Sequence, residues 1–139
     1  MTETRYTVIG AGHGGKSMAA HLAIMGFETT LFNRTPERVA PIIKRGGLDL
    51  ECNDGGPCGF GRLERITSSY SEALANADIV MVVTPSSAHR EVAACCAPHL
   101  RDGQVVVLNP GRTCGAIEFA KVIADNGCRA DVTVAEAGT

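Results

Sequence analysis

The sequence predicts a single doubly wound α/β domain, in which helices cover both faces of a parallel sheet. Short apolar segments alternate along the chain with segments whose apolar residues recur at helical spacing. The strand-like segments are apolar throughout, as DIVMVVT at residues 78–84 is, and such strands are covered on both faces. A chain of 139 residues is also the size of one ordinary domain.

The first part of the chain sets up this alternation. The predicted elements are a strand at residues 5–9 (RYTVI), a helix at 16–26 (KSMAAHLAIMG), a strand at 28–32 (ETTLF) and a helix at 33–47. The strands are short and rich in β-branched residues, and the first is closed by glycine. In the second helix we expect Thr35 as the N-cap, Pro36 at the first helical position and an end at Gly46 and Gly47.

Between residues 47 and 67 the rhythm changes. LDLEC and RLERIT alternate on either side of NDGGPCGFG, a glycine-rich turn. This pattern predicts a small antiparallel hairpin inserted into the α/β domain.

After the hairpin the alternation returns. The predicted elements are a helix at 69–77, a strand at 78–84, a helix at 86–100, a strand at 104–108, a helix at 113–127 and a strand at 131–135. The segment QVVVL at 104–108 is apolar enough for a buried strand, and the helix at 113–127 has an apolar face that includes Ile117, Phe119 and Ile123.

Composition excludes several classes of function. The formal net charge of −2 provides no basic field to attract nucleic acid or an anionic membrane. We expect a cytoplasmic location, because no signal peptide and no membrane-spanning apolar run is present. The six cysteines form no CxxC pair and the four histidines show no metal-ligand spacing, so we expect reduced thiols and no metal site.

The turn GAGHGG at residues 10–15 has the GxGxxG spacing of a dinucleotide-binding loop between a strand and a helix. Gly10 would permit the tight turn, Gly12 the close approach of a pyrophosphate, and Gly15 the packing of helix on strand. The backbone amides of residues 12–15 would then face the phosphates at the positive end of the helix dipole. This motif in this setting predicts a Rossmann dinucleotide-binding fold.

The same letters also fit a P-loop, because Gly10 and Gly15-Lys16-Ser17 satisfy GxxxxGK[ST]. A P-loop enzyme would need a further strand that ends in an aspartate to hold magnesium. The predicted strands instead run out at non-acidic residues, namely Phe32, Thr84, Leu108 and Ala135. The context therefore favours the dinucleotide.

The end of the second strand bears on which dinucleotide binds. An acidic residue there would favour NAD, but Asn33 and Arg34 offer donors and a positive charge, which favours NADP and leaves NAD open. Two other strand ends, Thr84-Pro85 and Asn109-Pro110, are expected to flank the nicotinamide.

Two further residues near these strand ends are ambiguous. His89 is either a helix-surface histidine or a ligand, and Arg112 is either a solvated loop charge or a ligand. The sequence alone does not choose between these roles.

GAGHGG at 10–15, VVTPSSAH at 82–89 and LNPGRTCGAIEF at 108–119 resemble the NAD(P)-dependent octopine/nopaline (opine) dehydrogenases. The resemblance implies reduction by NAD(P)H of the imine formed from an α-keto acid and an amino acid. By position it assigns cofactor contacts in three groups: Gly10, Gly12, His13, Gly14 and Gly15 to the pyrophosphate; Asn33, Arg34 and Thr35 to the adenosine ribose; and Thr84, Pro85, Asn109 and Pro110 to the nicotinamide side.

In that family a helical C-terminal domain supplies the catalytic histidine and much of the substrate site. Nothing follows Thr139, so we expect residues 1–139 to be the cofactor domain alone, which binds a dinucleotide without turning over the small-molecule substrate. Catalytic residues and any homo-oligomer are left open. The alternatives are the cofactor domain of a ketopantoate reductase, a glycerol-3-phosphate dehydrogenase or a 6-phosphogluconate dehydrogenase, and a stand-alone, non-catalytic NADP-binding module.

Overall fold

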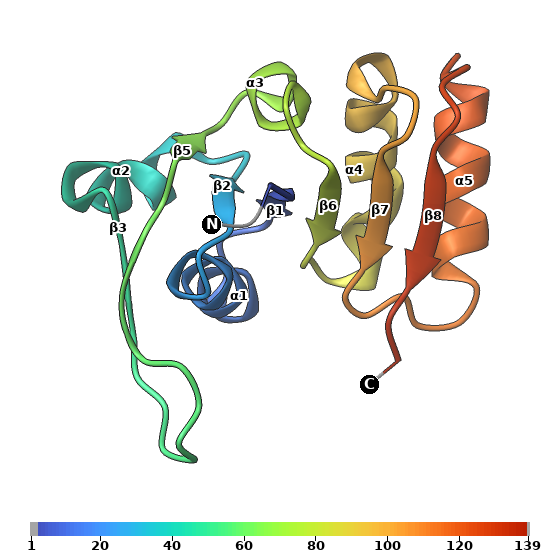
Figure 1. The fold of residues 1–139 in the computed structure, drawn as a ribbon. Coiled ribbons are helices and arrows are strands. Elements are labelled where there is room, and N and C mark those ends of the chain that lie inside the picture. The colour runs from blue at the N-terminus through green and yellow to red at the C-terminus, as the bar shows by residue number, and fades with distance from the viewer. Residues whose placement is uncertain (1–2, 139) are drawn as a thin grey trace.

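The computed structural model describes residues 3–138, which form a six-stranded parallel sheet (Figure 1). The strand order is β5-β2-β1-β6-β7-β8, and every neighbouring pair in this sheet is parallel. The strands are β1 (Arg5–Ile9), β2 (Glu28–Phe32), β5 (Arg65–Thr67), β6 (Ile79–Val82), β7 (Val105–Leu108) and β8 (Thr133–Glu136). The doubly wound α/β fold predicted from the sequence is confirmed.

Helices connect the strands and lie on both faces of the sheet. They are α1 (His13–Ile24), α2 (Pro36–Arg45), α3 (Tyr70–Leu74), α4 (His89–Cys96) and α5 (Gly115–Asp125), with short 3-10 turns η1 (Ser86–Ala88) and η2 (Ala97–His99) on either side of α4. Within residues 3–138, no helix combines the length and the apolar character needed to cross a membrane.

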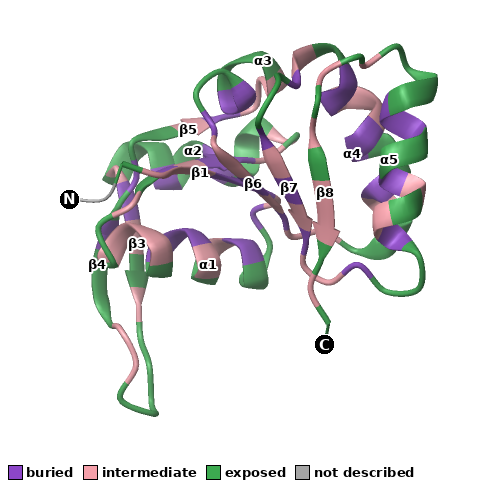
Figure 2. Cartoon of the chain, turned by 45° about the vertical axis from the view of Figure 1, so that its right-hand side comes forward, coloured by how far each residue is buried: buried purple, intermediate pink, exposed green. Residues whose placement is uncertain are grey.

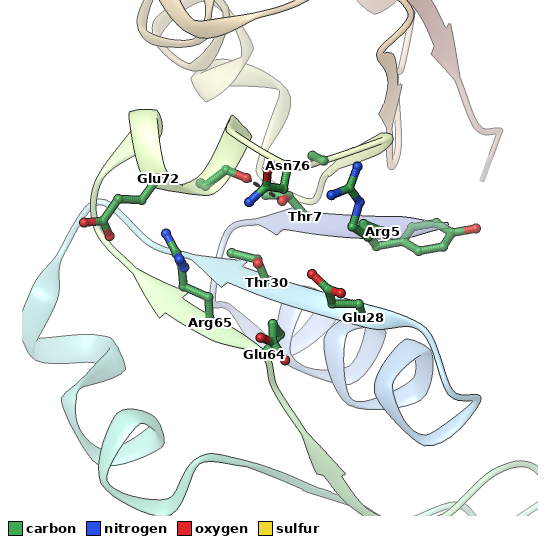
Figure 3. A pocket seen from close by; sticks show the side chains of 11 residues that line it. Arg5, Thr7, Glu28, Thr30, Glu64, Arg65, Glu72 and Asn76 are labelled. Atoms are coloured by element: carbon green, nitrogen blue, oxygen red, sulfur yellow. Dashed lines mark hydrogen bonds between the residues drawn. The ribbon is translucent and has the colours of Figure 1, made fainter. Parts of the chain in front are cut away.

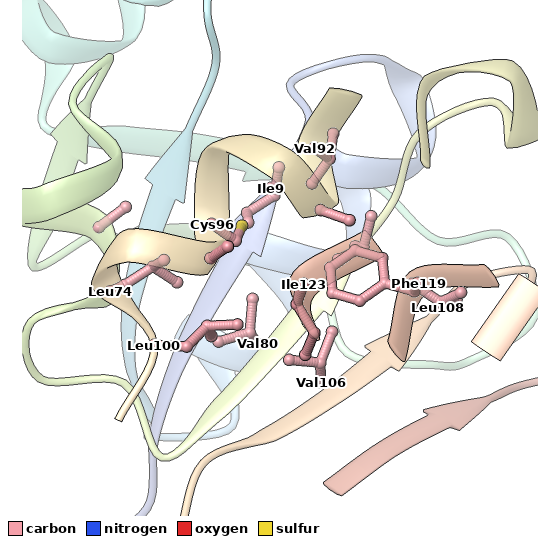
Figure 4. Close-up of a cluster of buried hydrophobic side chains, with 14 of the residues drawn as sticks. Ile9, Leu74, Val80, Val92, Cys96, Leu100, Val106, Leu108, Phe119 and Ile123 are labelled. Carbon is pink, nitrogen blue, oxygen red and sulfur yellow. The ribbon is translucent and has the colours of Figure 1, made fainter. Parts of the chain in front are cut away.

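The core consists of two apolar clusters, one on each face of the sheet. Successive side chains of a strand point to opposite faces, so Ile9 joins the cluster under α3, α4 and α5 while Val8 joins the cluster under α1 and α2. The larger cluster, drawn in Figure 4, packs Phe119 and Ile123 of α5 against the central strands. Buried residues accordingly follow the strands and the inner faces of the helices (Figure 2). This two-sided burial explains why the strands are apolar throughout.

The predicted hairpin exists, but its second strand was placed too late in the chain. Antiparallel β3 (Gly47–Leu50) and β4 (Gly59–Arg62) pair with each other, so residues 59–61 belong to a strand and not to the turn. The segment RLERIT is divided between two sheets. Leu63 N donates to Gly46 O at the base of the hairpin, and Glu64 N then donates to Thr29 O, which starts β5 at the edge of the main sheet.

The first helix also begins earlier than predicted. Gly12 has extended backbone angles and serves as the N-cap, and α1 starts at His13, whereas the apolar periodicity placed the start at Lys16. Glycine has low helix propensity, so the sequence pattern hid the first turn. The second helix matches the prediction, with Thr35 as N-cap, Pro36 first and Gly46 in the left-handed conformation at its end.

Candidate cofactor-binding site

A groove of about 420 Å³ lies at the carboxyl ends of β1, β2 and β6. Successive connections run in one direction from β1 to β2 and in the other from β6 to β7, so the order of the strands reverses between β1 and β6. In open α/β sheets, ligands bind outside the carboxyl ends of the strands at such a reversal. The groove therefore occupies the position that the fold itself favours for a ligand.

Gly10 and Gly15 are required by close packing in the turn after β1. Gly10 has φ +112°, which disfavours other residues, and a side chain there would strike the carbonyl oxygen of Val83 beyond β6. A side chain at Gly15 would strike the carbonyl oxygen of Gly10, so this glycine lets α1 pack directly on the end of β1. These are the roles expected of the first and third glycines.

Gly12 differs from both, because no atom lies within 4 Å of the position that a side chain would occupy. It lines the groove and is exposed. The space next to the Gly12 backbone is thus open, and a side-chain methyl group at this position would occupy part of it. A pyrophosphate that lies against this backbone fits the arrangement.

The N-terminus of α1 presents unpaired amides beside Gly12. No described side chain caps this helix and its first turn carries no acidic residue. The first intrahelical bond here runs from Lys16 N to Gly12 O over 3.0 Å, so the amides of His13, Gly14 and Gly15 precede the bonded part of the helix. Unpaired amides at the positive end of a helix dipole favour an anion.

The start of α1 also decides against the P-loop. A P-loop needs the residues between its two glycines to form a loop around phosphates. Here His13 and Gly14 are already helical, and only Ala11 and Gly12 separate Gly10 from α1. No loop of the required length remains.

Asn33 connects the turns after β1 and β2. Its side-chain oxygen accepts a hydrogen bond from Ala11 N over 3.2 Å, and its side-chain nitrogen donates to Thr35 O over 3.2 Å. Its backbone N donates to Thr67 O at the end of β5. Asn33 lines the groove and shapes the glycine turn, while Thr35 caps α2 without a side-chain hydrogen bond and is not part of the lining.

Arg34 reaches across the groove to α4. Its Nη1 donates to both carboxylate oxygens of Glu91, at 2.7 and 2.8 Å. Arg38, in the first turn of α2, also lines the groove. The sequence pointed to Arg34 by its place after β2. Glu91 and Arg38 were missed, because only the packing of α4 and α2 against the strand ends brings them here.

Aromatic rings form part of one wall. Tyr70, the first residue of α3, packs on Phe32 at a ring-centroid distance of 4.1 Å, and both line the groove. Burial raises the pKa of the Tyr70 phenol, so it is neutral at physiological pH. Tyr70 was also missed, since nothing in its local sequence separates it from a core tyrosine.

The strand ends beyond β6 and β7 are placed differently from each other. Thr84 and Pro85 line the groove, and the buried Thr84 Oγ1 has no hydrogen-bond partner among the described residues. Asn109 and Pro110 follow β7 and do not line it. The Asn109 side chain donates to Val107 O over 3.0 Å, and its backbone N donates to Val82 O over 2.8 Å. Asn109 is therefore hydrogen-bonded to the end of β6, next to the groove-lining Val83.

His89 and Arg112 lie in a second hollow of about 760 Å³ between the N-terminal ends of α4 and α5. His89 is buried and its Nε2 has no partner among residues 3–138. Burial lowers the pKa of this imidazole, and the carboxylates of Glu118 and Glu136 oppose that shift. Glu136 Oε2 also accepts a hydrogen bond from Ala116 N over 2.9 Å at the start of α5. Neither His89 nor Arg112 lines the cofactor groove.

A third cavity, shown in Figure 3, lies between α3 and the strands β1, β2 and β5. Thr7 Oγ1 donates to Ala73 O there over 2.6 Å. Its volume of about 70 Å³ is too small for a dinucleotide. Residues 3–138 hold no group of three or more His, Cys, Asp or Glu side chains that could bind a metal ion, and all six cysteines are free.

Comparison with known proteins gives matches along almost the whole chain. Residues 5–130 match the family model described as the NAD binding domain of 6-phosphogluconate dehydrogenase. An opine dehydrogenase from Arthrobacter sp. (strain 1C) is 35% identical over 131 residues, which are 94% of this chain and 36% of that protein. A glycerol-3-phosphate dehydrogenase from Afipia carboxidovorans is 32% identical over 108 residues, which are 73% of this chain and 30% of that protein.

Among solved structures, an octopine dehydrogenase with NADH and L-arginine has a TM-score of 0.79 at 21% identity. The match covers 94% of this chain and 34% of the octopine dehydrogenase chain. The chain thus spans about a third of the length of the opine dehydrogenases that it matches.

Proposed function

Because the chain belongs to the family of NAD-binding domains represented by that of 6-phosphogluconate dehydrogenase, we propose that it serves as the cofactor domain of an opine-type dehydrogenase. The observation that carries this proposal is the extent of the match to the opine dehydrogenase, which covers 94% of the chain, against 73% for the glycerol-3-phosphate dehydrogenase. The proposed reaction joins an α-keto acid to the amine of an amino acid and reduces the resulting imine. The nicotinamide supplies the hydride for that reduction.

In this proposal residues 1–139 bind and orient the dinucleotide. The open backbone at Gly12 and the unpaired amides at the start of α1 hold the pyrophosphate. Asn33 fixes the shape of that turn. Thr84 and Pro85, with Asn109 and Pro110 beside them, border the nicotinamide half. The groups that bind the keto acid and the amino acid lie outside residues 1–139.

We further propose that NADP is preferred over NAD. The residue after β2 is Asn33 and not an acid, so no carboxylate there would repel a ribose 2′-phosphate. Arg34 and Arg38 both line the groove next to that strand end and supply positive charge.

The test is an assay of the whole protein as its gene encodes it, which follows the oxidation of NADPH. The proposal predicts oxidation only when an α-keto acid and an amino acid are both present, with pyruvate and a panel of amino acids as first substrates. Omission of each substrate in turn is the control. Oxidation of NADPH with dihydroxyacetone phosphate alone would instead assign the chain to a glycerol-3-phosphate dehydrogenase.

A further inference from the structure

The ion pair between Arg34 and Glu91 connects the two walls of the groove. Arg34 follows β2, whereas Glu91 lies in the first turn of α4, which follows β6. One nitrogen of the guanidinium donates to both oxygens of the carboxylate, at 2.7 and 2.8 Å. Both residues line the groove. The Glu91 carboxylate is thus paired with the Arg34 guanidinium, which the proposed function assigns to a ribose 2′-phosphate.

The solvent exposure of the Arg34–Glu91 ion pair limits its strength. The two side chains are 67% and 55% exposed. An ion pair this open to water is weak and is screened by salt, so an incoming anion can displace the carboxylate at a small cost. The cost of displacing the carboxylate applies to NADPH, which has a 2′-phosphate, and not to NADH.

We propose that Glu91 is a specificity-determining residue that weakens the binding of NADPH relative to NADH by holding Arg34. This inference builds on the proposed function and deepens it. A 2′-phosphate, with a charge between −1 and −2, must take Arg34 away from Glu91 and leave that carboxylate unpaired beside a second anion. NADH carries no 2′-phosphate and leaves the pair intact. Glu91 therefore moderates the preference that Arg34 and Arg38 create.

The test compares dissociation constants for NADPH and NADH, measured by fluorescence titration, in the wild type and in Glu91→Gln. Glutamine keeps the shape of the side chain and removes its charge. The expected result is that NADPH binds roughly threefold to fivefold more tightly, whereas NADH affinity changes by less than about twofold. The gain should shrink at high salt. Glu64→Gln is the matched control, because Glu64 lies at the small cavity of Figure 3 and its loss changes the net charge equally.

A second background tests the mechanism. In Arg34→Gln, the further change Glu91→Gln should alter NADPH affinity by less than about twofold, because the pair is already broken. A gain of full size in that background, or an equal gain for NADPH and NADH, would overturn the inference while leaving the proposed function standing. Failure of the wild type to bind either dinucleotide would overturn both together.

Discussion

Gly12 and Gly15 lie three residues apart in the turn between β1 and α1, and a side chain would have opposite consequences at the two positions. Gly15→Ala places a methyl group against the Gly10 carbonyl, so we expect a loss of about 1–3 kcal/mol in the free energy of unfolding. Gly12→Ala places it in open space and loses only the preference of an N-cap for glycine over alanine, so we expect a loss of less than about 1 kcal/mol in stability and dinucleotide binding weakened by about tenfold.

Urea denaturation and titration with NADPH measure these two quantities in the same pair of variants. Each variant serves as the control for the other. Equal loss of stability in both would show that Gly12 is also held by packing within the protein.

Arg34 carries the proposed preference for NADP. Arg34→Asp replaces the donor to a 2′-phosphate by a carboxylate that repels it, and charged hydrogen bonds contribute about 1.5–3 kcal/mol. We expect NADPH binding to weaken by about tenfold or more and NADH binding by less than about threefold. Fluorescence titration with each dinucleotide gives both values, and equal losses would refute the assignment.

His89 should make folding stability depend on pH. Burial holds its pKa below the unfolded value of 6.5, so the unfolded chain binds a proton more readily than the folded one. The stability is fully present above about pH 6.5 and is lost as the pH falls from there toward the lower pKa of the folded state. Comparison of urea midpoints across this range should show a smaller slope in His89→Gln. An unchanged slope would contradict this account of His89.

Sequence reasoning located residues at the groove where their place depends on neighbours in the chain, and their contacts with a cofactor stay predictions. The packing of Gly10 and Gly15 follows from strand-turn-helix order, and the place of Asn33 and Arg34 at the groove follows from the end of β2. Glu91 and Tyr70 could not be found in this way. Each sits on a helix whose local sequence is ordinary, and tertiary packing alone brings it to the groove.

At the scale of elements, the hairpin of β3 and β4 is attached to the domain through α1. Gly61 of β4 lies against the backbone of Ala20, and a side-chain carbon there would be 2.7 Å from the Ala20 carbonyl oxygen. Gly61→Ala should therefore push the hairpin away from α1 and cost about 1–3 kcal/mol in the free energy of unfolding. Gly138→Ala, where no atom lies within 4 Å, is the control. Equal unfolding midpoints in the two variants would show that this contact adjusts freely.

Hydrophobic periodicity predicted the main sheet because both faces of its strands are buried, which leaves continuous apolar segments. It failed between residues 59 and 67. The pattern predicted one strand over RLERIT at residues 62–67, although Arg62 belongs to β4 and residues 65–67 belong to β5, and the two strands pair with different partners. A periodic pattern shows which residues are buried and not which strand they pair with.

In the whole molecule, the reversal of strand order between β1 and β6 determines where the candidate site lies. It places the glycine turn, Asn33 and Thr84 around one groove, although they come from three different parts of the chain. The sheet, both apolar clusters and the groove are all formed within residues 3–138. The chain therefore has the parts required to bind a dinucleotide as one domain.

Isothermal titration calorimetry of the 139-residue chain with NADPH and NADH tests this central claim most directly. The account predicts saturable binding at one site per chain, with NADPH bound more tightly than NADH and with both weakened in the stably folded Gly12→Ala variant. The absence of binding by the folded wild type, or undiminished binding by Gly12→Ala, would contradict the assignment of this groove to the cofactor.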